Sequence, residues 1–255
     1  MTNSYVLYHG PSVIDGAPIV AIATNFLGTS INPKVGASFI QTWILRAEID
    51  PLHAITIGAD RAICGNCGLR GTPTGKKADG RRCLVAPGHG ALPIWKQWHR
   101  GGIPFLSERR LKAVFGGRAV RLGAYGDPAA VPIGIWRKIM TRPAYWTGYT
   151  HQWRWCHQSY KRWCMASCET EQDRIDAHAL GWRTFRTTEH NAYDAQLDGE
   201  IVCPASLEAG YKTICERCKI CSGTDGDIRQ TDVVITFHGF AFQKGRFGRP
   251  VPAAS

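Results

Sequence analysis

Ten cysteines are the feature of this 255-residue chain that most restricts what it can fold into. The N-terminal stretch MTNSYVLYHG has no basic segment followed by an apolar one, so we expect no signal peptide and a cytoplasmic location. Thiols stay reduced there, and a dense set of them is more typical of metal ligation than of disulfides. Seven of the ten fall into two groups, which predicts two metal-binding segments.

The first group consists of Cys64, Cys67 and Cys83, in the stretches ICGNCGLR and RRCLV. The two-residue turn can point the first two sulfurs at one ion, and the third sulfur arrives after 15 further residues. Three thiolates leave one coordination position open, and an open position is where iron–sulfur or zinc chemistry takes place. His89 is an alternative fourth ligand, which would close the site and make it structural.

The second group has a C-x2-C-x2-C core preceded by one more thiol, and its members are Cys203, Cys215, Cys218 and Cys221. Four thiolates complete a tetrahedral zinc site or hold a cubane iron–sulfur cluster, and they suit both metals. The sequence therefore predicts a metal here without identifying it. The other cysteines, Cys156, Cys164 and Cys168, are expected in the core, because buried cysteine packs as a small apolar residue.

Strand-like and helix-like segments alternate along the chain. Residues 5–45 read as two or three strands joined by turns, and later strands are expected at 119–125, 146–151, 163–168, 182–187, 200–206 and 232–239. Helices are expected at 92–100, 131–140 and 171–180. This order predicts an α/β fold, a partial (β/α) barrel with predominantly parallel strands. We expect residues 1–200 to form the N-terminal strands and the barrel, and residues 201–255 to form a Cys-rich metal- or cluster-binding extension packed on it.

Asp127 stands between Gly126 and Pro128, where the strand at 119–125 ends. A tight turn accounts for the Gly and the Pro but not for the carboxylate. Because parallel strands bring their carboxyl ends to one face, we expect Asp127 to face the same cavity as the first cysteine group. The alternative is that Asp127 caps the helix that begins near Pro132.

The order of these motifs resembles that of the radical S-adenosylmethionine (SAM) family, in which a three-cysteine loop follows the first strand of a partial barrel. Gly126-Asp127-Pro128 is similar to the Gly-Gly-Glu-Pro-like motif that contacts the amino group of SAM, with Tyr125 in place of the first Gly. WTGYTH stands where the family has its third strand, and MASCET stands where it has its fourth. In the family the fourth strand often ends in Ser and an acidic residue. The second cysteine group is similar to the family's auxiliary-cluster extensions.

The chain is also similar to a set of phage and prophage proteins with YGD, YTH and C-terminal CP…C-x2-C-x2-C motifs. The resemblance implies a 4Fe-4S cluster and SAM as cofactors, with Gly126, Asp127 and Arg154 in cofactor binding. The cysteine spacing, C-x2-C-x15-C, departs from the family's C-x3-C-x2-C.

The charge balance is basic, with 31 Lys and Arg against 20 Asp and Glu, a formal net charge of +11. This excess favours a polyanionic partner such as nucleic acid, and the alternative is a solvated surface without a partner. Several of the nine Trp lie beside Arg or Lys, and indole rings stack on bases. No apolar run approaches the roughly 20 residues of a membrane span, so we expect no membrane partner.

The favoured function is an iron–sulfur, radical SAM-like enzyme that acts on a nucleic acid, nucleotide or peptide. Tyr149, His151 and Arg154 follow the third strand, so we expect them at the mouth of the barrel, with catalytic roles for Asp127, Tyr149 and His151. The alternatives replace the clusters with structural zinc. One is a transglycosylase-like nucleic-acid-modifying enzyme with Asp127 as acid/base or nucleophile, and the other is a zinc-containing nucleic-acid-binding protein.

Overall fold

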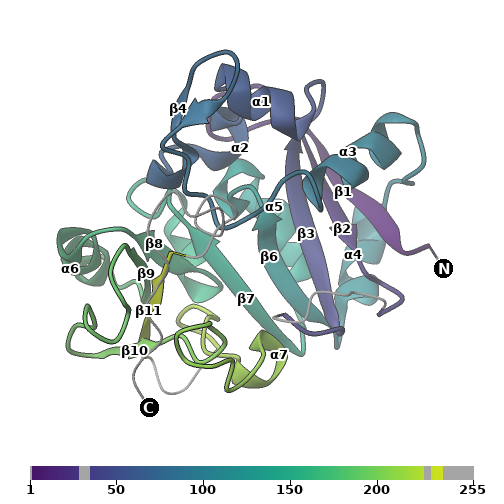
Figure 1. Cartoon of the computed structure of the whole chain (residues 1–255). Coiled ribbons are helices and arrows are strands. Elements are labelled where there is room, and N and C mark those ends of the chain that lie inside the picture. The colour runs from purple at the N-terminus through teal and green to yellow at the C-terminus, as the bar shows by residue number, and fades with distance from the viewer. Residues whose placement is uncertain (1, 29–34, 227–230, 238–255) are drawn as a thin grey trace.

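A nine-stranded sheet runs through the computed structural model, which describes residues 2–28, 35–226 and 231–237 (Figure 1). Its order is β1-β2-β3-β6-β7-β8-β9-β11-β10. The strands are β1 (Ser4–Pro11), β2 (Pro18–Thr24), β3 (Phe39–Arg46), β6 (Ala119–Tyr125), β7 (Tyr145–Thr150), β8 (Met165–Cys168), β9 (Thr184–Thr188), β10 (Glu200–Val202) and β11 (Asp232–Thr236). A separate two-stranded ladder is formed by β4 (Thr72–Pro73) and β5 (Ala78–Asp79).

Helices fill most of the connections between these strands (Figure 1). The α-helices are α1 (Pro51–Ile57), α2 (Arg61–Cys64), α3 (Ala91–His99), α4 (Glu108–Phe115), α5 (Ile133–Ile139), α6 (Glu171–Ala179) and α7 (Cys215–Cys218). Short 3-10 helices are η1 (Gly68–Arg70), η2 (Pro128–Ala130) and η3 (Gln158–Arg162). Local sequence accounts for several ends: Thr170 and Asp173 form a capping box at the start of α6, and Asp50 caps α1.

Strand direction divides the sheet into two parts. The pairs β1–β2 and β2–β3 are antiparallel, whereas every neighbouring pair from β3 to β10 is parallel. The prediction of an α/β fold with a mostly parallel sheet is therefore confirmed. Because these strands are parallel, the segments that follow β3, β6, β7 and β8 all leave the sheet at the same edge.

Alternation along the central strands separates a packed face from a cavity face. On β6, Val120 and Leu122 are fully buried in the main hydrophobic core, together with Trp136 of α5. The intervening Arg121 and the later Tyr125 line a cavity on the opposite face. The same period of two places polar and aromatic side chains of β3 and β7 on that face.

The C-terminal part of the described chain contributes to the sheet. The predicted division at residue 200 falls within β10, and β11 is inserted between β9 and β10. A buried pair fixes this region, because Arg186 on β9 donates to both carboxylate oxygens of Glu200, at 2.8 and 2.7 Å. Within the described residues, no helix combines the length and the apolar character that crossing a bilayer requires.

Candidate functional site

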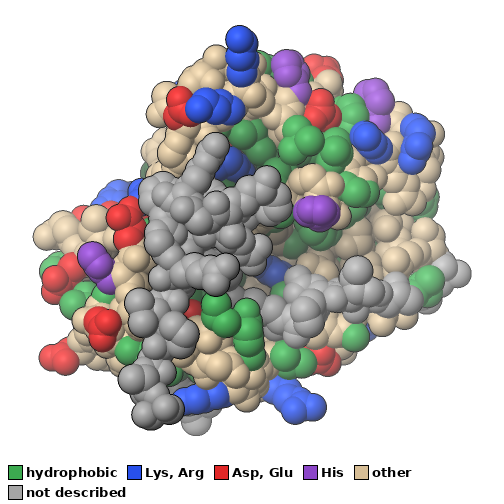
Figure 2. Space-filling model, in the orientation of Figure 1, with side chains coloured by type: hydrophobic (Ala, Val, Ile, Leu, Met, Phe, Trp, Pro, Cys, Tyr) green, Lys and Arg blue, Asp and Glu red, His purple; other side chains and the backbone are tan. Residues whose placement is uncertain are grey.

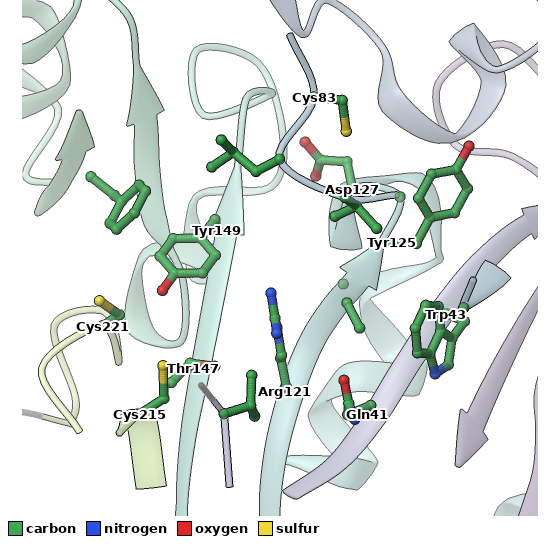
Figure 3. A pocket seen from close by; sticks show the side chains of 18 of the residues that line it. Gln41, Trp43, Cys83, Arg121, Tyr125, Asp127, Thr147, Tyr149, Cys215 and Cys221 are labelled. Carbon is green, nitrogen blue, oxygen red and sulfur yellow. The ribbon is translucent and has the colours of Figure 1, made fainter. Parts of the chain in front are cut away.

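Both cysteine groups line one cavity of about 1090 Å³ on the inner face of the sheet. Figure 3 shows Cys83 at one end and Cys215 and Cys221 at another, with Tyr149 and Arg121 between them. The cysteines among its lining residues are Cys64, Cys67, Cys83, Cys203, Cys215, Cys218 and Cys221. Two sequence motifs more than a hundred residues apart therefore belong to one site.

The first cysteine group, here called the trio, lies where the strands end. Cys64 closes α2, and Gly65 after it has a φ of 56°, in the left-handed region that favours glycine. The side chain of Gln152, just beyond β7, donates to the Cys64 carbonyl at 2.8 Å and accepts from the Asn66 amide at 3.2 Å. Through these bonds the segment after β7 holds the cysteine turn in place.

Asp127 belongs to the same end of the cavity. It lines the cavity together with the trio, and its amide donates to the Ile63 carbonyl at 2.6 Å, one residue before Cys64. Gly126 precedes it with a φ of 78°, where a Cβ would lie 2.7 Å from the Ile44 carbonyl oxygen of β3. The glycine is thus required by the turn that sets Asp127 beside the trio.

The carboxylate of Asp127 is only 6% exposed, and each of its oxygens accepts two hydrogen bonds. Oδ1 accepts from the Ala129 amide at 2.9 Å and the Thr150 hydroxyl at 2.7 Å. Oδ2 accepts from the His151 amide at 2.8 Å and the Gln152 side chain at 3.2 Å. Burial raises the pKa of Asp127, and these donors oppose the rise.

Asp127 therefore lines the cavity, as expected, and also caps a short helix, η2. The capped element is η2 and not the helix near Pro132, whose N-terminal residue Pro132 offers no side-chain acceptor. A carboxylate has about four lone-pair sites, and all four are used by described residues. In this structure Asp127 locks the segment after β7 against the trio turn.

His151 lies between a cysteine and a carboxylate. Its Nε2 is 3.6 Å from the Cys67 Sγ and 2.8 Å from the Glu169 Oε1. Burial opposes the charged ring, but Cys67 and Glu169 outweigh it and hold the pKa of His151 well above its ordinary value. His89 lines the cavity as well, yet His151 is the histidine that contacts a sulfur of the trio.

Positive charge is concentrated behind the trio. The buried carboxylate of Asp60 pairs with Arg70 at 2.5 Å and with Arg81 at 3.4 Å, so two guanidinium groups share one carboxylate. Within the described residues, Arg70 Nε, Arg81 Nη2 and the Tyr125 hydroxyl are buried without a hydrogen-bond partner. The surplus cation and the unpaired donors suit an anionic group at the trio.

The thiols of the trio are half-buried in the cavity lining and affect one another's pKa. Burial raises the pKa of Cys64 well above its ordinary value, Cys67 and Cys83 add to the rise, and Arg81 opposes it. Burial likewise raises the pKa of Cys83, and Arg81 lowers it. If these thiols were ionised together, their repulsion would call for a compensating cation, which a bound metal would supply.

The second cysteine group, here called the quartet, lines another part of the cavity. Cys215 packs against Phe39 and Ala119, the first residues of β3 and β6. Cys203 follows β10, where its amide donates to the Val234 carbonyl of β11 at 2.9 Å. The quartet thus lines the cavity from the first residues of β3 and β6, at Cys215, to the carboxyl end of β10, at Cys203.

Tyr149, which sequence reasoning expected at the mouth, lines the same cavity as the trio, on the side of the quartet. In Figure 3 its hydroxyl points toward the side of the cavity where Cys221 lies. Burial raises the pKa of Cys221 well above its ordinary value, Cys203 and Cys215 add to the rise, and the Tyr149 hydroxyl lowers it. Tyr149 is placed to orient a quartet sulfur.

Arg154 is the predicted site residue that the structure does not bring to the large cavity. Its guanidinium binds Asp173 at 2.8 Å and Asp176 at 2.9 Å on α6, and it lies 3.9 Å from the centre of the Trp153 ring. It lines a separate small cavity of about 90 Å³. The cause is the acidic face of α6, which offers Arg154 two carboxylates at the outer surface.

Sequence reasoning on single motifs missed Glu169, Gln152, Arg81 and Arg121. Glu169 had a signal in MASCET, and the others had none that local sequence could carry. Among residues 2–28, 35–226 and 231–237, no three His, Cys, Asp or Glu side chains lie close enough to hold one metal ion. The donor set still fits thiolate-bound metal in kind, since each group lines the cavity with neighbouring half-buried thiols and the trio has surplus cations behind it.

Comparisons of the chain with protein-family models, curated proteins and solved structures found no match.

Proposed function

We propose that this chain is an iron–sulfur enzyme of the radical SAM-like kind, with the trio as its cluster site. The observation that carries the proposal is the meeting of Cys64, Cys67 and Cys83 with Asp127 in the lining of one large cavity. That cavity extends away from the trio, so a group held there would face room for a substrate. The parallel strands β3, β6, β7, β8 and β9 also lie side by side in chain order, as a partial (β/α) barrel requires.

The trio would hold a 4Fe-4S cluster, with one iron position left for SAM or substrate. Such a cluster, when bound, supplies single electrons for reductive cleavage of SAM. The chain's own residues prepare the site. Arg81 and Arg70 offset thiolate charge, and His151 places a proton between Cys67 and Glu169. Asp127 fixes the cysteine turn through its bonds with Ile63 and Gln152.

The quartet would hold a second cluster or a zinc ion, in a Cys-rich extension that forms part of the cavity wall. Its four half-buried or buried thiols and the Tyr149 hydroxyl support this role. The basic composition supports an anionic substrate, either a nucleic acid, a nucleotide or a peptide.

A zinc-stabilised, transglycosylase-like enzyme or a zinc-containing nucleic-acid-binding protein is the second candidate. The observation in its favour is the 3.6 Å contact of His151 with Cys67, because three cysteines and one histidine form a closed zinc site. Closed coordination would leave the trio without an open position. The metal then stabilises the fold and takes no part in chemistry.

Metal analysis of anaerobically purified protein separates these functions. We expect a brown protein with absorbance at about 400 nm and about four iron atoms per cluster. Both the absorbance and the iron content should fall when Cys64 or Cys83 is replaced by Ser. Cys156→Ser is the matched control, since Cys156 lies in the core and outside the cavity lining. A colourless protein with stoichiometric zinc would replace the iron–sulfur function with the second candidate.

A further inference from the structure

We propose that the cavity contains an oxyanion-binding subsite centred on Arg121, which receives a phosphate or carboxylate group of the substrate. The subsite lies on β6, four residues before Tyr125 and away from the trio. The inference rests on the proposed function in one respect, namely that this cavity is the substrate chamber. It adds the chemical class of the substrate, which neither cysteine group specifies.

A polar row across three strands forms the floor of the subsite. Gln41 on β3 pairs in register with Arg121 on β6, and Arg121 pairs in register with Thr147 on β7. Residues in register on neighbouring parallel strands lie about 5 Å apart on the same face. Gln41 is 7% exposed and Thr147 is 4% exposed, so an amide and a hydroxyl flank the guanidinium below the surface.

The guanidinium points into the cavity. In Figure 3, Arg121 rises between Thr147 and Gln41 toward the space beside Tyr149, and all four residues line the cavity. Within the described residues, Arg121 forms no ion pair and its side chain no hydrogen bond. Its neighbours Val120 and Leu122 are fully buried on the packed face, so β6 cannot turn its cation outward without exposing the core.

Charge in the cavity is one-sided. Among the described lining residues the only carboxylate is Asp127, whose oxygens are fully used at the far end of β6. Arginine keeps its charge at all ordinary pH values, and an unpaired cation in a confined space is costly. A planar, five-donor guanidinium beside an amide and a hydroxyl matches the oxygens of a phosphate or carboxylate.

Aromatic side chains stand on both sides of the row. Trp43 pairs in register with Tyr125 on the side of β3, and the Tyr149 and Phe185 rings lie 4.6 Å apart on the side of β8 and β9. All four rings line the cavity. The subsite therefore fits an oxyanion attached to a flat or apolar group, such as a nucleotide or an aromatic carboxylate.

Two matched ligand pairs test the subsite on the full-length protein with its metals as purified. The first pair is adenosine 5′-monophosphate and adenosine, and the second is N-acetyltryptophan and its amide. By calorimetry we expect the charged member of at least one pair to bind ten times or more tightly than its neutral partner. A preference within the first pair would identify the bound group as a phosphate, and a preference within the second would identify it as a carboxylate.

Variants assign that preference to Arg121. We expect Arg121→Gln to reduce it at least tenfold, and Arg121→Lys, which keeps a charge without the planar fork, to reduce it less. Arg109→Gln is the control, because Arg109 is exposed on α4 and outside the cavity lining. If Arg121→Gln fails to fold, a reduced preference in Arg121→Lys and in Thr147→Val carries the same conclusion.

The outcomes separate this inference from the proposed function. A preference that Arg121→Gln leaves unchanged, or no preference in the unaltered protein, overturns the subsite. Loss of quartet metal in Arg121→Gln with the preference intact also overturns it, and would assign Arg121 to the charge of the thiolates. A zinc-containing protein with an Arg121-dependent preference would keep the subsite and defeat the iron–sulfur function.

Discussion

Cys67 and His151 lie 84 residues apart in the sequence, and the sulfur of one is 3.6 Å from Nε2 of the other. The strand order explains the meeting, since Cys67 follows β3 and His151 follows β7, and β6 lies between those strands. Glu169, beyond β8, holds the same ring nitrogen at 2.8 Å. Segments after three parallel strands thus converge on the His151 ring.

Replacing His151 with Ala should weaken metal binding at the trio without unfolding the protein. Residues that orient metal ligands typically contribute about 10–100-fold to metal affinity, and His151 contacts Cys67 directly. The measurement is metal retained against a competing chelator, with His53→Ala on the exposed surface of α1 as the control. Equal retention in the two variants would show that the contact does not support the metal.

Thiol labelling should divide nine of the ten cysteines into two sets. Cys156, Cys164 and Cys168 are buried in the core, where a reagent cannot reach the sulfur, so the folded protein should resist alkylation there even at about pH 8.5. The half-buried cavity cysteines should react once a chelator has removed metal. These are Cys64, Cys67, Cys83, Cys215, Cys218 and Cys221.

Mass spectrometry of labelled peptides before and after chelation gives the comparison. Protection of the half-buried set before chelation, and its loss afterwards, is the expected result. Equal labelling in the two conditions would mean that neither group binds metal in the purified protein.

Local patterns predicted most secondary structure correctly. The strand expected at 119–125 coincides with β6, and the helix expected at 171–180 contains α6. Helix α4 was not predicted, because ERRLKAVF is short and half charged, and only the burial of Leu111 and Phe115 on one side stabilises it. Hydrophobic periodicity predicts a helix reliably only when its apolar face spans enough residues to be distinguished from the charged positions.

Sequence could not predict how the site is assembled. Each cysteine group was visible as a spacing, but their shared cavity depends on β10 and β11 returning the chain to the sheet beside β9. Arg121 looked like one more basic residue in a basic chain. Its place between the buried Val120 and Leu122 was the available signal, since a lone charge there must face something other than the core.

The capping box of α6 should give a pH-dependent contribution to stability. Burial favours the neutral form of Asp173, but hydrogen bonds from Arg154, Thr170 and the Glu169 amide outweigh it and lower the pKa of Asp173. A carboxyl with a lower pKa in the folded state stabilises the protein above its unfolded pKa, and this contribution is lost as pH falls through the folded pKa.

We therefore expect Asp173→Asn to lower the free energy of unfolding by about 1 kcal/mol at pH 7, and by less toward pH 3. Urea unfolding at a series of pH values measures this. Asp79→Asn, which removes an exposed pair with Lys77, should cost less than about 0.5 kcal/mol at pH 7. If Asp173→Asn lowered the free energy of unfolding by the same amount at pH 7 and at pH 3, the ionised carboxylate of Asp173 would not be what stabilises the helix.

Binding of nucleic acid, if the net charge of +11 serves it, should fall steeply with salt. On the face shown in Figure 2, Lys and Arg side chains stand at several separate places instead of one dense patch. Such a distribution favours non-specific contact with phosphates. Fluorescence anisotropy with a single-stranded oligonucleotide at about 50 and 200 mM salt tests this. An absence of binding at the lower salt concentration would leave the basic excess as a solvated surface.

Asp127→Asn should destabilise the protein, although Asn is itself a good helix cap. Each carboxylate oxygen of Asp127 accepts one backbone amide, from Ala129 at Oδ1 and from His151 at Oδ2. An Asn side chain has one oxygen and one NH2 group, so in either orientation the NH2 would face a backbone N–H that cannot rotate away. A buried donor left unsatisfied costs about 1–3 kcal/mol, and we expect that loss in urea unfolding of metal-free protein. Asp15→Asn is the control, because Asp15 accepts a single amide, that of Ala17, in an exposed turn and should cost less than about 0.5 kcal/mol. An Asp127→Asn protein as stable as the control would mean that the four bonds do not hold the turn, and that the carboxylate serves a ligand instead.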